Sequence, residues 1–318
     1  MGMYKPENDR LFQRGLKVSH LQLMAALLEA GQITLAAASI GVSQPAASRL
    51  LAEIETIIGS PVYQRTGRSV SLTAAGRMLG LRAQRVQMEL RDAARELTEI
   101  ANGGAGHVRI GSVTGPAIDR VLPAVRTARV TDPNVTIEVV VAPSDEMCNH
   151  VLSGRLDFAI GRLTEASGKG LLEFQHVASE PVSLVVRRGH PLARQSPVLG
   201  AELMEFDWVM PGPGSILTRA VMARIRAHGL STPPQRLSTA SFLLTFALLQ
   251  QSNAIAPLSR AVADSFTLGP DAAFAQLPID LGIEVEPYGL ITRSQMTMTP
   301  AATRLAAQIC GIETHSQA

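Results

Sequence analysis

Aromatic residues and cysteines are scarce in this sequence. Only 4% of the 318 residues are aromatic, whereas 46% are hydrophobic, so leucine, valine, isoleucine and alanine must form most of the core. The two cysteines, Cys148 and Cys310, are far apart along the chain. Their number and separation exclude a zinc motif of paired cysteines and the disulfide framework of a small secreted protein.

Long apolar runs are lacking as well. The N-terminal segment is polar, with Glu7, Asp9 and Arg10 in the region where a signal peptide has its apolar stretch. No segment reaches the length of a membrane-spanning helix without a charged residue, a proline or a glycine. We therefore expect a soluble, cytoplasmic protein that has no membrane partner.

Sequence signatures of catalysis are also missing. There is no convincing nucleophile elbow, no lysine-containing phosphate loop and no His/Glu spacing typical of a metal site, and the seven histidines are scattered. His190 is followed by proline, which favours a turn over a catalytic role. We therefore expect no enzyme activity, no bound metal and no cofactor.

The chain is long enough for two or three domains, and its charge is uneven. Residues 1–101 contain 12 Lys/Arg and 9 Asp/Glu, while the remainder contains 17 and 18. A small positive excess at one end is typical of a nucleic-acid-binding domain. Asn102–Gly106 (NGGAG) is a cluster of turn-forming residues that marks a boundary between two parts.

The first part begins with two predicted helices. Apolar residues between Leu21 and Leu28 recur at helical spacing, and this helix should end near Gly31. Thr34 can cap a second helix over Leu35–Ile40. Small and apolar residues then occupy the elbow that two short, steeply packed helices need. This pattern indicates a helix-turn-helix, and an ordinary helical hairpin is the alternative.

A third helix follows a tight turn at Gly41. Ser43 can cap it, and Pro45 falls in its first turn, where a missing N–H is harmless. Glutamine and arginine near its start can bond base edges bidentately in the major groove, whereas the alternative is a solvated helix face. The expected DNA-contacting residues of the two helices are Thr34, Ser43, Gln44, Pro45, Ser48 and Arg49.

A wing and a long helix are expected next. Val62–Arg65 and Ser69–Leu72 have the pattern of two short strands joined by a turn at Thr66–Arg68. Arg65 and Arg68 would then be placed to contact phosphates or the minor groove. Thr73 can cap the long helix that follows.

The long helix over 74–101 has apolar residues at heptad spacing. A seam that narrow suits a two-helix coiled coil, and a two-fold dimer places two recognition helices on an inverted repeat. Packing against the chain's own second domain is the alternative. The two seam positions are filled by Ala83, Leu90 and Leu97 and by Leu79, Val86, Ala93 and Ile100, of which we expect Leu79, Val86, Leu90 and Leu97 to hold the dimer.

Residues 107–312 alternate strand-like and helix-like segments. Val108–Gly111, Thr136–Val141 and Asp157–Gly161 are apolar runs separated by helix-length segments, which favours a parallel α/β architecture. Ser183–Val186 opens a second, similar lobe.

Four predicted strands of this region end in small polar residues just before a helix. Free N–H groups and the helix dipole at such places favour anions or polar oxygens, although ordinary capping is the alternative for any single residue. Two facing lobes would bring the four ends to one cleft, with Arg162 as a charge partner. The expected ligand-binding residues are Ser112, Thr114, Gly115, Ser144, Arg162, Ser215 and Thr239.

The order of residues resembles the LysR family of transcriptional regulators. The departures are mild, such as Ile54 where the family usually has leucine, and none removes a DNA-facing side chain. In the first part, the resemblance is carried by Ser43–Arg49 (SQPAASR), Glu55, Gly59, Pro61, Arg65–Arg68 (RTGR) and Leu72–Gly76 (LTAAG). In the second, it is carried by Arg155–Gly161 (RLDFAIG), Gly189–Leu192 (GHPL) and Ala254–Pro257 (AIAP).

The resemblance implies three segments. They are a winged helix-turn-helix DNA-binding domain over 16–73, a linker helix for dimerisation over 74–101, and a periplasmic-binding-protein-like effector-binding domain of two α/β lobes over 107–312.

The resemblance also implies a role. The expected regulator binds double-stranded promoter DNA as a homodimer or as a dimer of dimers, a homotetramer. It responds to a small polar or anionic metabolite, a sugar or a carboxylate, and RNA polymerase is a further expected partner. Leu16–Leu21 and the alanine-rich helices resemble the branch that includes the galactose-binding protein regulator, which responds to sugars. The alternative is an enzyme or small-molecule-binding protein with an incidental N-terminal helical domain, which would not bind promoter DNA specifically.

Overall fold

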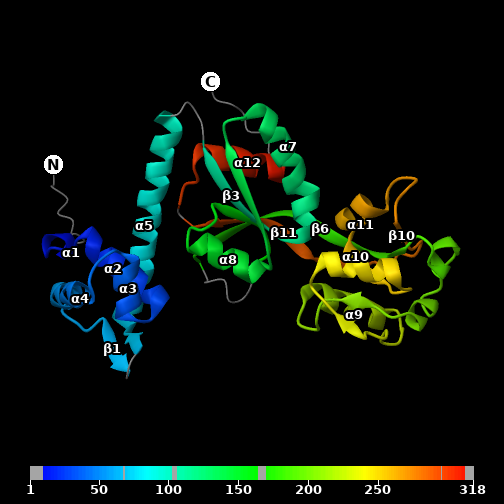
Figure 1. Cartoon of the computed structure of the whole chain (residues 1–318), viewed down its shortest axis with the longest axis horizontal. Coiled ribbons are helices and arrows are strands. Elements are labelled where there is room, and N and C mark those ends of the chain that lie inside the picture. Colours follow the sequence, from blue (N-terminus) through cyan, green and yellow to red (C-terminus); the bar gives the residue numbers. More distant parts are fainter. Residues whose placement is uncertain (1–9, 67–68, 102–105, 164–169, 295, 312–318) are drawn as a thin grey trace, which may run out of the picture. The chain divides into compact units, whose positions relative to one another are not determined.

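A computed structural model describes residues 10–66, 69–101, 106–163, 170–294 and 296–311 (Figure 1). The chain divides into two compact units, residues 1–98 and residues 99–318. Within the described ranges, no helix combines the length and the hydrophobicity that a membrane span requires.

The first unit contains a cluster of helices, a hairpin and the start of a long helix (Figure 1). Leu23, Met24, Leu51, Ile54 and Val62 are fully buried and form the centre of its core. The elements are α1 (Arg10–Gln13), α2 (Val18–Ala30), α3 (Ile33–Ser39), α4 (Gln44–Ile58), β1 (Tyr63–Thr66), β2 (Ser69–Leu72) and α5 (Ala74–Ala101).

The predicted start of the third helix is confirmed, but that of the second is wrong. Ser43 caps α4, because its hydroxyl accepts a hydrogen bond from the Ala46 N–H at 3.4 Å, and Pro45 lies in the first turn. In contrast, α3 begins at Ile33, so Thr34 lies inside the helix and does not cap it. The reason is that Ile33 is buried in the core, which draws the helix start towards Gln32.

The hairpin forms as predicted, except that its first strand lies one residue later than expected. β1 and β2 pair antiparallel, with Tyr63 opposite Leu72 and Thr66 opposite Ser69. Val62, predicted to open the first strand, belongs to the core instead. Its N–H donates to Glu55 Oε1 at 3.0 Å and its carbonyl accepts from the Thr73 N–H at 3.1 Å.

The long helix α5 has the predicted bounds, and Thr73 caps it by accepting a hydrogen bond from the Gly76 N–H at 3.1 Å. Its first turns pack into the core of the first unit, where Leu79 and Ala83 are buried. The prediction that Leu79 lies in a dimer seam is therefore wrong. Heptad spacing alone could not separate the turns that cover the chain's own core from those that do not.

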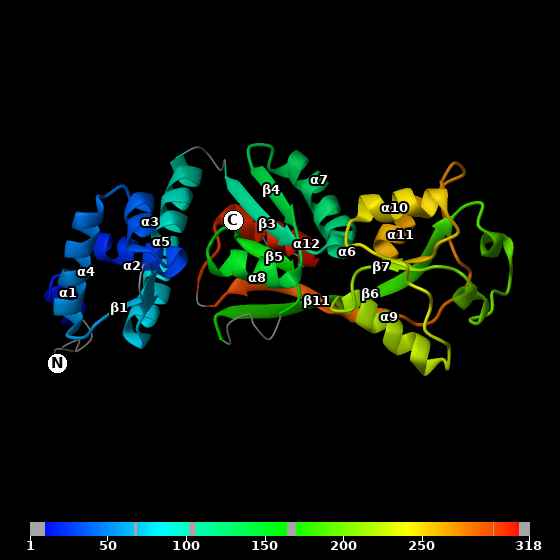
Figure 2. The same ribbon diagram turned by 60° about the horizontal axis from the view of Figure 1, so that its bottom comes forward.

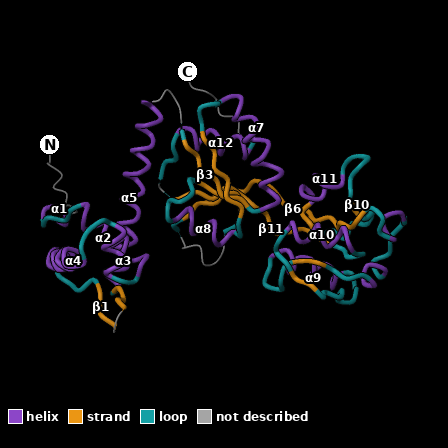
Figure 3. The backbone as a smooth tube through the Cα atoms, viewed as in Figure 1, coloured by secondary structure: helices purple, strands orange, loops and turns teal. Residues whose placement is uncertain are grey.

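The second unit is built on one mixed sheet, whose strands are orange in Figure 3. The strand order is β10-β6-β11-β5-β3-β4, and β9 also pairs with β6. Strands β3, β4 and β5 are parallel to each other, whereas β11 is antiparallel to both β5 and β6. The strands of this sheet are β3 (His107–Ser112), β4 (Thr136–Val141), β5 (Phe158–Gly161), β6 (Leu172–Arg187), β9 (Ala256–Ser259), β10 (Phe274–Gln276) and β11 (Glu284–Arg293).

The first lobe has helices on both faces of β3, β4 and β5 (Figures 1 and 2). Alternate residues of β5 point to opposite faces: Phe158 and Ile160 pack in one core, and Ala159 packs in the other. The first face is covered by α7 (Leu122–Thr131) and α12 (Pro300–Cys310), and the second by α8 (Ser144–Leu152).

The second lobe repeats this layered arrangement around the end of β6. Leu184 and Val186 pack towards α9 (Ile216–Ala227), while Val185 packs towards α10 (Phe242–Gln251) and α11 (Arg260–Thr267). A short parallel pair, β7 (Val209–Met210) and β8 (Leu237–Ser238), lies in the same lobe.

The two lobes share the long strands β6 and β11, which Figure 2 shows continuing from one lobe into the other. Up to Pro181, β6 pairs with β11; from Val182 onward it pairs with β9 and β10. The sequence predicted a parallel architecture, which is confirmed for β3–β5 but wrong for this part of the sheet. The first part of β6 contains exposed polar residues, such as Glu173 and Gln175, so it does not form an apolar run that would indicate a strand.

His190 belongs to a turn of the second lobe, as predicted. Its ring is buried and lies 4.5 Å from that of Phe206. Nδ1 accepts from the Leu192 N–H at 3.1 Å, and Nε2 lies 3.0 Å from the Asn253 carbonyl, so both nitrogens are used by the neutral ring. Burial lowers the pKa of His190 below its ordinary value of 6.5, and the nearby Arg187 lowers it further.

We predict that acidification destabilises the second unit through His190. Because the pKa of His190 is lower in the folded state than in the unfolded state, the unfolded state binds the proton more readily. The free energy of unfolding is therefore at its full value above pH 6.5 and falls as the pH drops below it. Urea unfolding between about pH 7.5 and about pH 5.5 measures this slope. His190→Gln should flatten it, and the exposed His176→Gln should not. An unchanged slope in His190→Gln would contradict the assignment.

Candidate functional site

The start of α4 presents the residues expected to contact DNA. Gln44, Pro45 and Arg49 are exposed and Ser48 is half-buried, whereas the opposite side of the helix is buried in the core. The exposed side therefore carries amide, hydroxyl and guanidinium groups that can hydrogen-bond to bases and phosphates. Ser43 is exposed at the cap of the same helix.

The remaining predicted DNA contacts have different outcomes. Thr34 is exposed on α3, although it does not cap that helix. Arg65 lies on β1, but its side chain and the whole of Arg68 fall outside what the structure describes. Their place at the tip of the wing stays a prediction.

A cavity of about 540 Å³ lies between the two lobes of the second unit. The starts of α8, α9 and α10 border it, as does α6 (Thr114–Pro116), which continues through η2 (Ala117–Val121) into α7. The first lobe contributes Val113, Thr114, Gly115, Pro143, Ser144, Asp145 and Arg162. The second lobe and the shared strands contribute Glu180, Val182, Pro211, Gly214, Ser215, Ile216, Leu217, Arg219, Ala240, Phe242, Ser259 and Val285.

Five of the seven predicted ligand-binding residues line this cavity: Thr114, Gly115, Ser144, Arg162 and Ser215. The placement of the other two was wrong. Ser112 is fully buried at the end of β3, and its hydroxyl donates to the Val113 carbonyl at 2.9 Å. Thr239 precedes the lining residue Ala240, and its hydroxyl accepts from the Ser241 N–H at 3.1 Å.

Arg162 is held by partners within the protein. Its backbone N–H donates to Ser144 Oγ at 3.1 Å, and its Nε donates to the Glu286 carbonyl on β11 at 2.6 Å. Its terminal nitrogen forms an ion pair with Glu180 Oε2 on β6. The two side chains are 8% and 13% exposed, so the pair is largely shielded from water. The positive charge of Arg162, which we expected to pair with a ligand, is therefore already balanced by Glu180.

The sequence analysis missed Glu180 and Ser259. Glu180 is a single acidic residue ahead of the apolar run from Val182 to Val186, and nothing in the sequence connects it to Arg162. Ser259 closes β9 directly before α11, where a serine indicates no more than a cap. Only the pairing of the strands in the sheet shows that both residues border the cavity.

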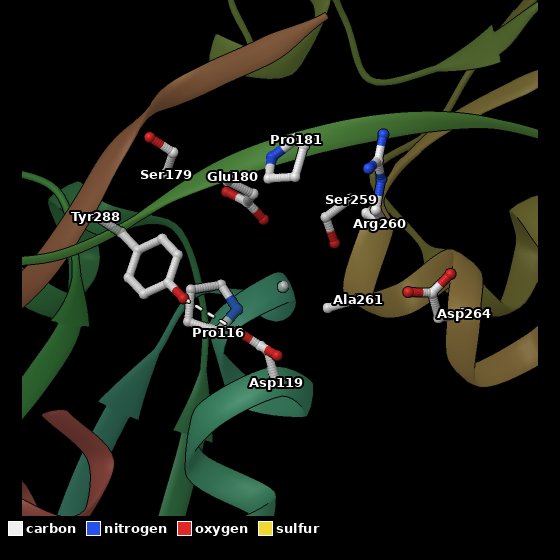
Figure 4. A pocket seen from close by; sticks show the side chains of 11 residues that line it. Pro116, Asp119, Ser179, Glu180, Pro181, Ser259, Arg260, Ala261, Asp264 and Tyr288 are labelled. Carbon is white, nitrogen blue, oxygen red and sulfur yellow. Dashed lines mark hydrogen bonds between the residues drawn. The ribbon is translucent and has the colours of Figure 1, made fainter. Parts of the chain in front are cut away.

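A second cavity, of about 200 Å³, shares Gly115, Glu180 and Ser259 with the first (Figure 4). Tyr288 from β11 borders it, and its hydroxyl donates to Asp119 at 3.3 Å. Burial raises the pKa of Tyr288, so the hydroxyl remains protonated at neutral pH. The three shared residues thus lie at the junction of the two cavities.

Comparison with known proteins identifies both units. Residues 18–77 match the family described as bacterial regulatory helix-turn-helix protein, lysR family, and residues 101–310 match the LysR substrate binding domain. The chain belongs to the LysR family. The predicted family is therefore confirmed, and the helix-turn-helix and the two-lobed α/β unit are the parts of a LysR-type regulator.

Curated LysR relatives are similar over most of their length. The regulator GbpR of Rhizobium radiobacter is 41% identical over 81% of this chain and 86% of its own. GbpR of Azospirillum brasilense is 35% identical over 92% and 85%. These relatives are transcriptional regulators. The chain is accordingly a LysR-type DNA-binding transcriptional regulator with an effector-binding domain, and not an enzyme.

Solved LysR structures share the fold. A full-length OxyR variant from Pseudomonas aeruginosa matches with a TM-score of 0.63 at 17% identity, over 93% of this chain and 98% of that one. Full-length CbnR bound to its target DNA matches with a TM-score of 0.52 at 21% identity, over 92% and 98%.

Proposed function

We propose that this regulator contacts promoter DNA with the exposed start of α4 and changes transcription when a small polar metabolite binds between its two lobes. The cavity lined from both lobes is the observation that carries the proposal. A ligand that touches both lobes favours a closed arrangement, because its contacts differ between open and closed states. Closure turns the linker helices and alters the bend of the bound DNA, to which RNA polymerase at the promoter responds.

The DNA contacts follow from side-chain chemistry. Gln44 and Arg49 read base edges in the major groove, since both can form two hydrogen bonds to one base. Ser43 and Ser48 bond phosphates or bases, and Arg65 and Arg68 on the wing neutralise phosphates. The arginines of the wing add affinity for every DNA sequence, whereas the α4 contacts add specificity.

Gln44→Ala and Arg49→Ala should each weaken binding to the operator by about 1–3 kcal/mol, the free energy of a good bidentate base contact. Binding to scrambled DNA should change little. Gel-shift titrations on both DNAs measure the difference. Gln22→Ala, which changes another exposed glutamine, on α2, is the matched control. Operator affinity that stays unchanged in both α4 variants would contradict the recognition-helix assignment.

The later turns of α5 support a dimer. Val86, Leu90 and Leu97 are 40%, 53% and 68% exposed, although they are apolar and follow heptad spacing. An identical helix from a second copy would cover this stripe and place two α4 helices on the two halves of an inverted repeat. We propose that these three residues, without Leu79, hold a dimer that can pair further into a dimer of dimers.

Leu90→Asp should break this dimer, because the seam would then bury an unpaired charge. Light scattering should show a smaller particle, and operator affinity should fall because a single half-site binds weakly. Leu81→Asp introduces the same change at an exposed position outside the seam and should keep the parent mass. If Leu90→Asp also keeps the parent mass and affinity, α5 is not the dimer interface.

The effector is proposed to be a sugar or a carboxylate. Helix starts that border the cavity suit polar oxygens, and the apolar side chains of Leu217 and Phe242 suit a carbon skeleton. The name of the two GbpR relatives, galactose-binding protein regulator, supports a sugar. A thermal-shift screen of sugars and organic acids finds the effector, because a ligand of the native state raises the melting temperature.

The double variant Thr114→Ala/Ser144→Ala should lose affinity for the ligand found in that screen, because both residues line the cavity. Operator binding should remain. Isothermal calorimetry measures the ligand affinity. Thr239→Ala is the control, since its hydroxyl lies outside the cavity and should not affect binding. Full ligand affinity in the double variant would mean that the effector binds elsewhere.

A further inference from the structure

The two arginines that border the interlobe cavity differ in burial and in their partners. Arg162 is buried and pairs with Glu180, while its Nε donates to the Glu286 carbonyl. Arg219 is exposed to solvent and donates to the Gly214 carbonyl at 2.6 Å. An incoming carboxylate would therefore find no buried, unpaired cation among the described lining residues.

At the junction of the two cavities, in contrast, two oxygen atoms have no hydrogen-bond partner among the described residues. The hydrogen bond from Arg162 uses Oε2 of Glu180, which leaves Oε1 without a bonded partner among the described residues. Ser259 is 8% exposed, and its Oγ has no hydrogen-bond partner in the described part of the chain. Figure 4 shows the Glu180 carboxylate and the Ser259 hydroxyl directed into the same cavity.

Gly115 leaves the space that these two groups occupy. A Cβ at this position would overlap Glu180 Oε1 and lie 2.9 Å from Ser259 Oγ. The three residues come from α6 of the first lobe, from the shared strand β6 and from the end of β9 in the second lobe. A ligand group at the junction therefore contacts both lobes at once.

We infer that Glu180 and Ser259 determine the specificity of the effector site, and that they select a neutral ligand bearing hydroxyl groups over a carboxylate. This inference rests on the proposed function, because it concerns the same interlobe site. A ligand hydroxyl can donate to Glu180 Oε1 while a second hydroxyl bonds Ser259 Oγ, and the Arg162–Glu180 pair stays intact.

A carboxylate is disfavoured for two reasons. It carries the same charge as Glu180, and repulsion between close, poorly hydrated charges is strong. It can gain Arg162 only by separating the arginine from Glu180, which would leave the Glu180 carboxylate buried without its cation. A neutral hydroxyl meets neither cost.

The test is isothermal calorimetry on the full chain with two sets of probes. One set holds neutral monosaccharides and polyols (D-galactose, D-glucose, L-arabinose and glycerol), and the other holds carboxylates (succinate, benzoate and pyruvate). The parent chain should bind a member of the neutral set and no carboxylate. Glu180→Gln should weaken that neutral ligand about tenfold or more and should strengthen carboxylates, because Arg162 is then free to pair with them.

Two further variants sharpen the result. Ser259→Ala should weaken the neutral ligand without any gain for carboxylates, because it removes a hydroxyl and leaves the ion pair in place. Glu173→Gln, which removes an exposed carboxylate from the same strand, should leave both affinities unchanged. Circular dichroism and operator binding establish that each variant is folded. If Glu180→Gln does not fold, Ser259→Ala decides the question.

The possible failures are distinguishable. A carboxylate that binds the parent chain more tightly than every neutral probe, and loses affinity in Thr114→Ala/Ser144→Ala, would overturn the inference while the proposed site stands. Ligand binding that is unaffected by that double variant would instead refute the site itself. Parental affinities in both Glu180→Gln and Ser259→Ala, or no binding by any neutral probe, would also overturn the inference.

Discussion

The antiparallel pairing of β6 with β11 is the constraint on which the effector-binding unit depends. β6 pairs with β11 in the first lobe and with β9 and β10 in the second, so both lobes share one continuous backbone. The pairing is close at Gly289, where a Cβ would overlap the Gln175 carbonyl. Because the two strands are fixed in this way, Glu180 and the Glu286 carbonyl both reach Arg162 from the shared strands. The cleft is therefore lined by fixed groups of the two shared strands as well as by the two facing lobes.

The long helix α5 has two different environments along its length. Near its start, Gly76 lies against the Val62 carbonyl so closely that no side chain fits, and Leu79 and Ala83 complete the core of the first unit. Further along, Leu90 and Leu97 keep large exposed fractions. The helix is thus rigidly attached to the winged helix-turn-helix at one end and offers an apolar stripe at the other.

Local signals predicted most of this structure, and the errors have physical causes. The cap at Ser43, the bounds of α5 and the apolar runs that form β3, β4 and β5 depend on residues close in sequence. The missed strands have exposed polar residues, and their pairing joins segments about a hundred residues apart. Ser112 and Thr239 were misplaced by about one residue, because at a strand or turn end each step along the chain changes the direction of the side chain. The Arg162–Glu180 pair could not be predicted at all, since it exists only when the sheet is complete.

That ion pair is weak as a source of stability. Removing two charges from water opposes their attraction, so a buried pair contributes about as much as apolar residues of the same size, or less. Stability alone therefore does not explain why a guanidinium and a carboxylate stand at the centre of a cleft that also contains Leu217, Phe242 and Val285. Paired, the two groups present no net charge to a ligand and keep a carboxylate oxygen without a hydrogen-bond partner beside Ser259. A site built in this way discriminates by charge and by hydrogen-bond donors, and it does so from the strands that both lobes share.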